Sequence, residues 1–188
     1  RPGDVNDDGE IQAYDAALTL QHSVGLDPLP AEDGLPWENW RDSTANVNGD
    51  GAITAYDAGL ILQYSAGVIS DFSEGIKKSA PIADISLEVM DDRIVFYSHG
   101  ELVGMNISIQ DTNKSLGHPI ILSENSLSGD QMGFLTAINI DDTSYRIGLC
   151  ASTSPMDGAP ILEIPYTKSG LVTFSILLNE EEKEVTVD

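Results

Sequence analysis

The first part of this 188-residue chain contains an internal duplication. The stretch DVNDDGEIQAYDAALTLQHSVG, residues 4–25, recurs without a gap as NVNGDGAITAYDAGLILQYSAG, residues 46–67. By alignment of the two copies, 14 of the 22 positions are identical. Each copy places Asp or Asn at alternating positions, passes through a Gly and continues with apolar residues at helical spacing. Self-similarity of this kind predicts two equivalent structural units.

The spacing of oxygen-bearing side chains in each copy fits a twelve-residue calcium loop. Such a loop takes side-chain oxygens from positions 1, 3, 5 and 12, a backbone carbonyl from position 7, and a side chain or water at position 9. A Gly at position 6 permits the sharp turn. The sequence therefore predicts two Ca²⁺ ions, with ligands Asp4, Asn6, Asp8, Glu10, Gln12 and Asp15 in the first loop, and Asn46, Asn48, Asp50, Ala52, Thr54 and Asp57 in the second.

Two positions depart from the common loop pattern. Position 12 is Asp in both copies, where Glu is usual, and position 1 of the second loop is Asn46 instead of an acid. Fewer carboxylates lower calcium affinity, so the second site is expected to be the weaker one. The alternative interpretation, Asx-rich turns without a metal, is disfavoured by two aligned copies at full ligand spacing.

A helix is expected after each loop, over residues 13–24 and 55–66. Gly25 and Gly67 follow these stretches and are typical of residues that end a helix. Because only three residues precede Asp4, each unit is expected to be a loop with one exiting helix, or half an EF-hand.

Residues 3–70 resemble a dockerin domain, the calcium-folded module that binds cohesin domains in cellulosomes. The two loop-plus-helix repeats, Asp at position 12 and Ile at position 8 carry the resemblance. It implies a cohesin-type partner, which loop positions 10 and 11 and the following helix would recognise. In this sequence those positions are Ala13, Tyr14, Leu20, Gln21 and Gly25, and their counterparts Ala55, Tyr56, Leu62, Gln63 and Gly67.

The nearly identical copies also predict that the partner can bind in two orientations related by about a half turn. Many cellulosomal dockerins carry a Ser-Thr pair where both copies here have Ala-Tyr. A paired Tyr suits an interface anchor, and internal packing of Tyr14 and Tyr56 is the alternative. The connector 26–45 contains Trp37 and Trp40, which are expected to pack against the helices; a sugar-stacking platform is the other interpretation.

From about residue 70 the pattern changes. Residues 71–81 are expected to form a linker, and the rest shows the alternation of short strands with Gly, Asn and Asp turns. The fold class is therefore multidomain α + β: a small all-α dockerin over 1–70 and an antiparallel β-sandwich over 82–188. The nine expected strands are 84–90, 93–98, 102–110, 119–123, 134–140, 145–151, 160–167, 171–178 and 184–187.

This second half resembles a cohesin-type jelly roll. Three segments in order carry the resemblance: LVGMNISI, then YRIGLCASTSPMDG, then PILEIPY followed by LVTFSI. Asn106 and Asn113 also match a glycosylation acceptor pattern, with Asn106 on the outward face of its strand. Residues 180–184 are expected to form a solvated hairpin tip.

Composition and motifs argue against several function classes. With 31 Asp+Glu against 9 Lys+Arg, the formal charge of −22 opposes nucleic-acid and anionic-membrane binding. The single cysteine, Cys150, excludes an intrachain disulfide or a Cys-rich zinc site and is expected to be a packed small residue. No catalytic motif appears around His22, His99 or His118, so no enzymatic activity is predicted.

The leading hypothesis is a secreted, non-catalytic assembly protein whose calcium-loaded dockerin binds a cohesin-type domain. Another copy of the same chain is a candidate partner, and repeated head-to-tail contacts would then give an extracellular filament. The alternative is a dockerin joined to a carbohydrate-binding or stabilising sandwich of a cellulosome-like, polysaccharide-degrading system. A fragment of a larger enzyme is a third interpretation.

Overall fold

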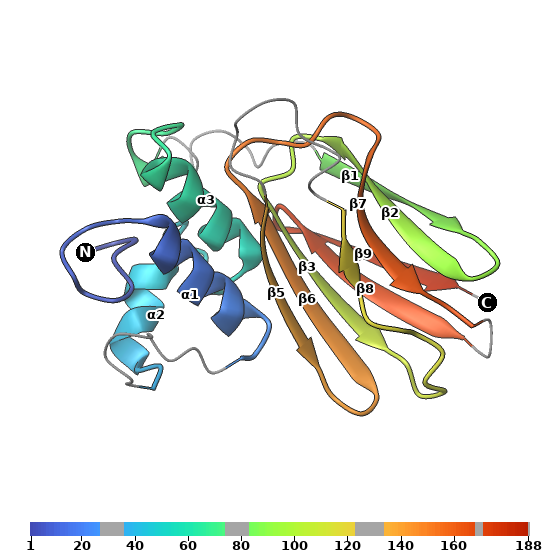
Figure 1. Cartoon of the computed structure of the whole chain (residues 1–188). Coiled ribbons are helices and arrows are strands. Elements are labelled where there is room, and N and C mark those ends of the chain that lie inside the picture. Colours follow the sequence, from blue (N-terminus) through green and yellow to red (C-terminus); the bar gives the residue numbers. More distant parts are fainter. Residues whose placement is uncertain (27–35, 74–82, 123–133, 168–170, 188) are drawn as a thin grey trace.

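A computed structural model describes residues 1–26, 36–73, 83–122, 134–167 and 171–187 of the chain, in which a helical part precedes a β-sandwich (Figure 1). The predicted fold class is confirmed. The helices are α1 (Ala13–Ser23), α2 (Asn39–Ala45) and α3 (Ala55–Ser65). The strands are β1 (Ala83–Val89), β2 (Arg93–Gly100), β3 (Gly104–Gln110), β4 (Ile120–Ile121), β5 (Phe134–Ile140), β6 (Ser144–Ala151), β7 (Ala159–Pro165), β8 (Val172–Leu178) and β9 (Glu181–Val187).

The last residue of each predicted calcium loop, Asp15 or Asp57, also caps the start of a helix. Asp15 accepts a hydrogen bond from the backbone N–H of Gln12 at 2.8 Å, and Asp57 accepts one from Thr54 at 3.0 Å. These carboxylates satisfy N–H groups that a helix start leaves unpaired, and their charge suits the positive end of the helix dipole. At the other end, Gly25 and Gly67 adopt φ of +75° and +72°, which a side chain would disfavour.

A short helix, α2, lies in the connector, where none was predicted. Just before it, Trp37 stacks on His22 of α1 with ring centroids 4.0 Å apart and donates a hydrogen bond to Asp42. Trp37 therefore packs against a helix, as expected. Trp40 does not: its side chain is 39% exposed and lies beside the Arg41 guanidinium.

The sandwich consists of two antiparallel sheets. One has the strand order β1-β2-β7-β4 and the other β5-β6-β3-β8-β9. The inward-facing apolar side chains of both sheets form one core. In it the rings of Phe96 and Phe174 pack edge to face, with their centroids 5.5 Å apart. Each of the nine predicted strands is present, although β4 is only two residues long and β9 begins three residues before its predicted start.

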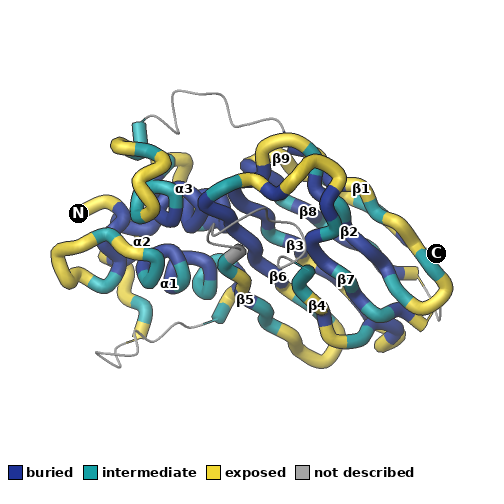
Figure 2. The backbone as a smooth tube through the Cα atoms, turned by 45° about the horizontal axis from the view of Figure 1, so that its top comes forward, coloured by how far each residue is buried: buried dark blue, intermediate teal, exposed yellow. Residues whose placement is uncertain are grey.

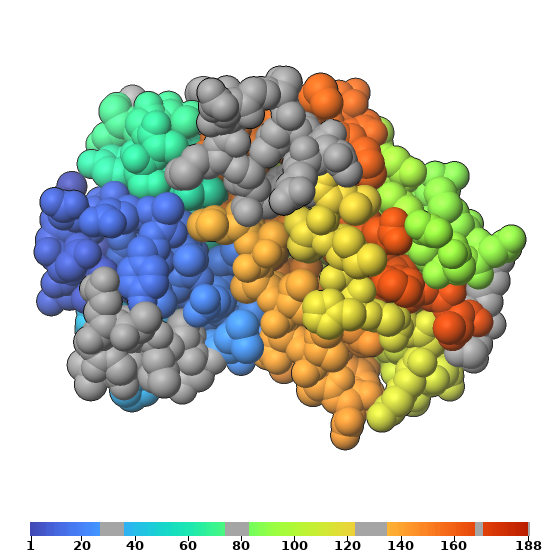
Figure 3. Space-filling model, viewed as in Figure 1, coloured from blue at the N-terminus to red at the C-terminus, as the bar shows by residue number. Residues whose placement is uncertain are grey.

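The helices form a third layer on the outer face of the five-stranded sheet (Figures 1 and 2). Helix α1 contacts β5 and β6, and α3 contacts β6 and β3. The space-filling view shows the N-terminal part directly against the strands coloured orange (Figure 3). Of the predicted linker 71–81, only residues 71–73 are among the described residues.

Candidate functional site

The first predicted calcium loop is turned by its own side chains. Asp4 accepts the N–H of Gly9 at 3.1 Å, and Asn6 and Asp8 each accept the N–H two residues further on, at 3.2 and 2.8 Å. The second loop repeats the last two bonds through Asn48 and Asp50, at 3.1 and 2.8 Å. Such Asx bonds bend the backbone so that the oxygens of positions 1, 3 and 5 line the inside of the turn.

The position-12 carboxylates of both loops are fully buried. Asp15 and Asp57 each have 0% exposure. Besides its capping bond, Asp15 accepts the N–H groups of Val5 and Asn6, and Asp57 accepts those of Val47 and Asn48. None of the ion pairs that the described residues form involves either carboxylate. A buried carboxylate without a cationic partner is costly, and a bound cation would remove that cost.

Asp4 gives the most direct indication that an ion fits the first loop. It is only 3% exposed, and its Oδ1 has no hydrogen-bond partner. Buried polar atoms are nearly always paired, so an orphaned carboxylate oxygen at loop position 1 suits a hard cation. Within the described ranges, no three His, Cys, Asp or Glu side chains gather closely enough to hold a metal by themselves. The predicted ligand sets differ from such a cluster because they include Asn amides and backbone carbonyls.

The affinity of the second loop for calcium is predicted to decrease as the pH is lowered. Burial raises the pKa of Asp57 to about 6 and also raises the pKa of Asp15. Because calcium requires the ionised carboxylate, affinity should fall up to about tenfold for each pH unit below about 6. For the ion-free protein, the raised pKa means that the Asp57 contribution to stability is present below pH about 4 and is lost as pH rises through about 6.

Titration calorimetry in buffers with different ionisation enthalpies checks this prediction, because the difference in heat counts released protons. About half a proton from Asp57 should leave on calcium binding at pH 6, and almost none at pH 8. Equal and negligible proton release at both pH values would contradict the assignment of Asp57 as a ligand.

Asn106 of β3 joins both helices to the sheet. Its Oδ1 accepts the N–H of Ala55, the first residue of α3, at 2.7 Å. Its Nδ2 donates to Oγ of Ser23, the last residue of α1, at 3.0 Å. The first N–H groups of a helix lack intrahelical partners, so one amide caps α3 and holds the end of α1 at once. Asn106 thus lies on the outward face of the sheet, as expected, but the helices cover it.

Asn139 of β5 makes a second bond to the end of α1. Its Nδ2 donates to the carbonyl oxygen of Val24 at 3.0 Å. That carbonyl belongs to the last turn of the helix, where acceptors are also left unpaired. Asn106 and Asn139 therefore replace, at two helix ends, the water that an isolated helix pair would need.

Glycines on both sides allow α3 and β3 to approach backbone to backbone. A Cβ added to Gly104 would lie 2.2 Å from the carbonyl carbon and oxygen of Ala55. A Cβ added to Gly59 would lie 2.4 Å from the carbonyl oxygen of Val103. Atoms cannot come this close, so only Gly fits at either position. A third glycine, Gly148, lies under Leu20 of α1, whose Cδ1 would be 2.9 Å from an added Cβ.

The remaining contact is an apolar cluster shared between helices and sheet. The buried sheet residues Val103, Ala137 and Cys150 belong to the same cluster as the core of the helical part. The core between the two sheets is a separate cluster. Cys150 is a packed small residue, 0% exposed, and burial raises the pKa of its thiol. The outer face of the sheet thus has its own hydrophobic layer beneath the helices.

The turn between β8 and β9 reaches the second loop. Glu180 accepts a hydrogen bond from the Asn48 amide. Tyr56 is 4% exposed, and burial followed by the charges of Glu180 and Asp57 raises its pKa to about 12. Glu180, Glu181, Glu182 and Glu184 are exposed, as predicted for a solvated hairpin tip, and the sheet also brings Glu180 against the second loop.

The predicted partner-binding residues fall into two groups. One group lies at the sheet and consists of Leu20, Gly25, Ala55 and Tyr56. Gly25 is beside Arg146, Leu20 lies over Gly148, and Ala55 and Tyr56 lie at Gly104. Their counterparts are arranged differently. Tyr14 is half-buried. A Cβ added to Gly67 would have no other atom within 4 Å, so this residue borders open space. The other members of the predicted set are Ala13, Gln21, Leu62 and Gln63. Sequence reasoning missed Ser23, Val24, Gly59 and the whole sheet side of the contact.

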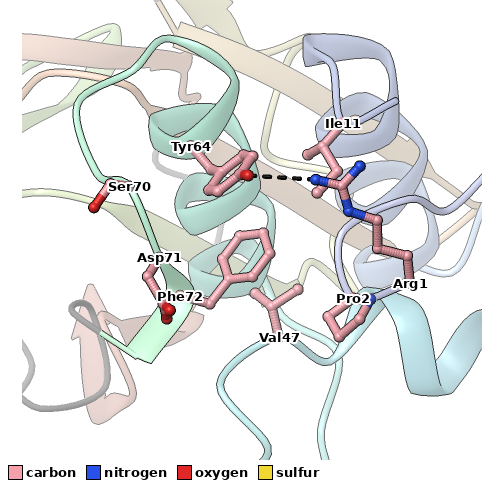
Figure 4. Close-up of a pocket in the computed structure, with 8 residues that line it drawn as sticks. All are labelled: Arg1, Pro2, Ile11, Val47, Tyr64, Ser70, Asp71 and Phe72. Atoms are coloured by element: carbon pink, nitrogen blue, oxygen red, sulfur yellow. Dashed lines mark hydrogen bonds between the residues drawn. The ribbon is translucent and has the colours of Figure 1, made fainter. Parts of the chain in front are cut away.

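A cavity of about 370 Å³ lies on the helical part, between the N-terminus and the end of α3 (Figure 4). Arg1 donates to the Tyr64 hydroxyl at 3.4 Å, and Tyr64 stacks on Phe72 with centroids 5.0 Å apart. The lining also includes Ile11 and Val47, one from each repeat. These contacts tie the start of the helical part to the segment that follows it.

Comparisons with known proteins gave a family match and a structural match. Residues 2–64 match the family model described as the dockerin type I domain, which confirms the dockerin prediction. Dockerin domains bind calcium. No curated protein matches the chain significantly. Among solved structures, it is similar to a cohesin module from a Clostridium perfringens ATCC13124 family 33 glycoside hydrolase. That match has 9% identity and a TM-score of 0.36, and covers 59% of this chain and 97% of the other.

None of the described helices is long and apolar enough to cross a membrane.

Proposed function

We propose that this chain is a non-catalytic, extracellular assembly module in which a calcium-loaded dockerin, holding two Ca²⁺, docks on a cohesin-type sheet. The observation that carries the proposal is the contact between the α1–α3 face and the β5-β6-β3 face. Its hydrogen bonds cap helix ends, as Asn106 does for Ala55, and its glycines fit backbone to backbone. These are features of a shaped interface, in contrast to two domains that merely share a chain.

The contact within one chain also sets the conditions for assembly between chains. An intramolecular partner acts at an effective concentration in the millimolar range, so dilute protein is expected to be a closed monomer. At higher concentration, two copies can exchange the contact, each dockerin docking on the sheet of the next chain. This arrangement joins two different surfaces, so repetition gives a head-to-tail filament unless the rotation closes a ring.

The aromatic residues of the sandwich do not favour the carbohydrate-binding alternative. Phe96, Tyr166 and Phe174 are buried, and the hydroxyl of half-buried Tyr97 donates to Glu88 at 2.8 Å. The described aromatic side chains therefore do not form the exposed row that binds sugar chains.

Size-exclusion chromatography with light scattering, from dilute to about 1 mM protein, tests assembly. Calcium-loaded protein is expected to change from monomer to larger species as concentration rises, and a chelator should abolish them. Asn106→Ala should populate open chains and speed the exchange between monomer and larger species, because it leaves the Ala55 N–H unpaired, at a cost of about 1–3 kcal/mol, in the closed and the exchanged contact alike. Asn113→Ala, the same change at an exposed turn, is the matched control. A monomer at every concentration in calcium would refute self-assembly.

A further inference from the structure

We propose that the sheet accepts the two helices in only one of the two orientations that the duplication offers. Two features favour the observed orientation: the absence of a side chain at Gly59, and the low charge of the second loop. The inference rests on the proposed docking function and adds the residues that decide its geometry. In the observed orientation, the start of α3 and the end of α1 lie on the sheet.

A half turn that exchanges the repeats would move each residue to the place of its counterpart. Ala17 would then occupy the position of Gly59, and Ser65 that of Ser23. Most contact positions would be unchanged, because Ala13 matches Ala55 and the two serines are identical. The place of Gly59 would instead receive a methyl group.

The sheet has no room for that methyl group. A Cβ at position 59 would lie 2.4 Å from the Val103 carbonyl oxygen and 2.7 Å from its Cγ1. The oxygen cannot move away easily, since it accepts the Ala151 N–H at 3.0 Å. The Val103 N–H is also held, by Oδ1 of Asn179 at 2.9 Å. Ala17 would therefore push the helix away from β3 along its length.

Charge disfavours the exchanged orientation independently. Glu180 lies against the second loop, which contains two acidic residues, whereas the first loop contains five. With one Ca²⁺ in each, the formal charges are 0 for the second loop and −3 for the first. A half turn would bring the more negative loop to the carboxylate of Glu180, and like charges at close range repel.

Two cross-linking reporters distinguish the orientations in the full, calcium-loaded chain. Both carry Cys150→Ala and Asn139→Cys; one adds Ser23→Cys and the other Ser65→Cys. Asn139 contacts Val24, the neighbour of Ser23, so a short bismaleimide should join the first pair and not the second. Peptide mass spectrometry at low protein concentration measures the yields. We expect the two yields to differ by about 5- to 150-fold, which corresponds to the cost of about 1–3 kcal/mol for forcing an extra methyl group into a packed contact.

The swap Ala17→Gly with Gly59→Ala keeps the composition and should reverse the preference, so that the Ser65 reporter gives the higher yield. Ala17→Gly alone should raise the Ser65 yield while leaving the Ser23 reporter active. Equal yields in the parent background, or a swap without effect on the ratio, would overturn the orientation proposal while leaving docking intact. Loss of cross-linking in both parent reporters would overturn the docking function itself.

Discussion

Removing calcium is expected to raise the rate at which Cys150 reacts with a thiol reagent by about a thousandfold. In the docked protein this thiol is fully buried beneath the helices, in the apolar cluster that they share with the sheet. Saturating calcium at 1,000 times Kd stabilises a site by about 4 kcal/mol, which corresponds to that factor in the population of the open state. Without the ions, the buried carboxylates Asp15 and Asp57 lose their cationic partner and the helical part should unfold.

The sandwich itself should survive chelation, because its core between the sheets is a separate cluster. Hydrogen exchange of β1 and β2 provides the control: their amides should stay protected while those of α1 and α3 exchange. Returning calcium should restore the slow reaction of Cys150. An unchanged labelling rate in the chelator would show that calcium does not hold the helices on the sheet.

Gly104→Ala is the substitution expected to break docking most strongly with calcium present. Its methyl group would meet the Ala55 backbone at 2.2 Å, where neither partner can yield: β3 lies between β6 and β8, and Asn179 holds the Gly104 N–H at 3.0 Å. A cost near 3 kcal/mol corresponds to a rise in Cys150 labelling of about a hundredfold.

Gly148→Ala is the matched control, since it places the same methyl group on the same face of the same sheet. Its nearest neighbours are Leu20 Cδ1 at 2.9 Å and Val24 Cγ1 at 3.0 Å. Side-chain tips can rotate away where a backbone cannot, so the labelling rate should rise by less than about tenfold. Similar rates for the two variants would show that close backbone approach does not determine docking.

The sequence predicted the elements well because each one follows from local pattern. The loop turns, the helix starts at Ala13 and Ala55, and the alternating strands all depend on neighbours a few residues away. The loop alternation was also sufficient to identify the dockerin, which the family match confirms. The short helix α2 was missed because seven residues carry too little periodicity to distinguish a helix from a loop.

What the sequence could not provide was the meeting of residues far apart in the chain. Asn106 fits a glycosylation pattern in sequence, yet it lies 51 residues from the helix start that it caps. Glu180 is separated from Asn48 by 132 residues. Gly59 differs from Ala17 by one methyl group. That difference affects packing only because the Val103 carbonyl oxygen lies where the methyl group would be. Such pairings depend on how two layers stack, which periodicity does not encode.

The order of the layers along the chain also has a consequence for synthesis. Helix α3 ends at Ser65, whereas β6, the strand that both helices contact, ends only at Ala151. At about 5–20 residues per second, the ribosome needs about 4–17 s to make the intervening stretch. Throughout that interval the newly made helices lack their own sheet, while every completed neighbour already has one. The apolar faces of α1 and α3 are therefore made well before the surface that buries them, so docking on the sheet is a late step of folding even within one chain.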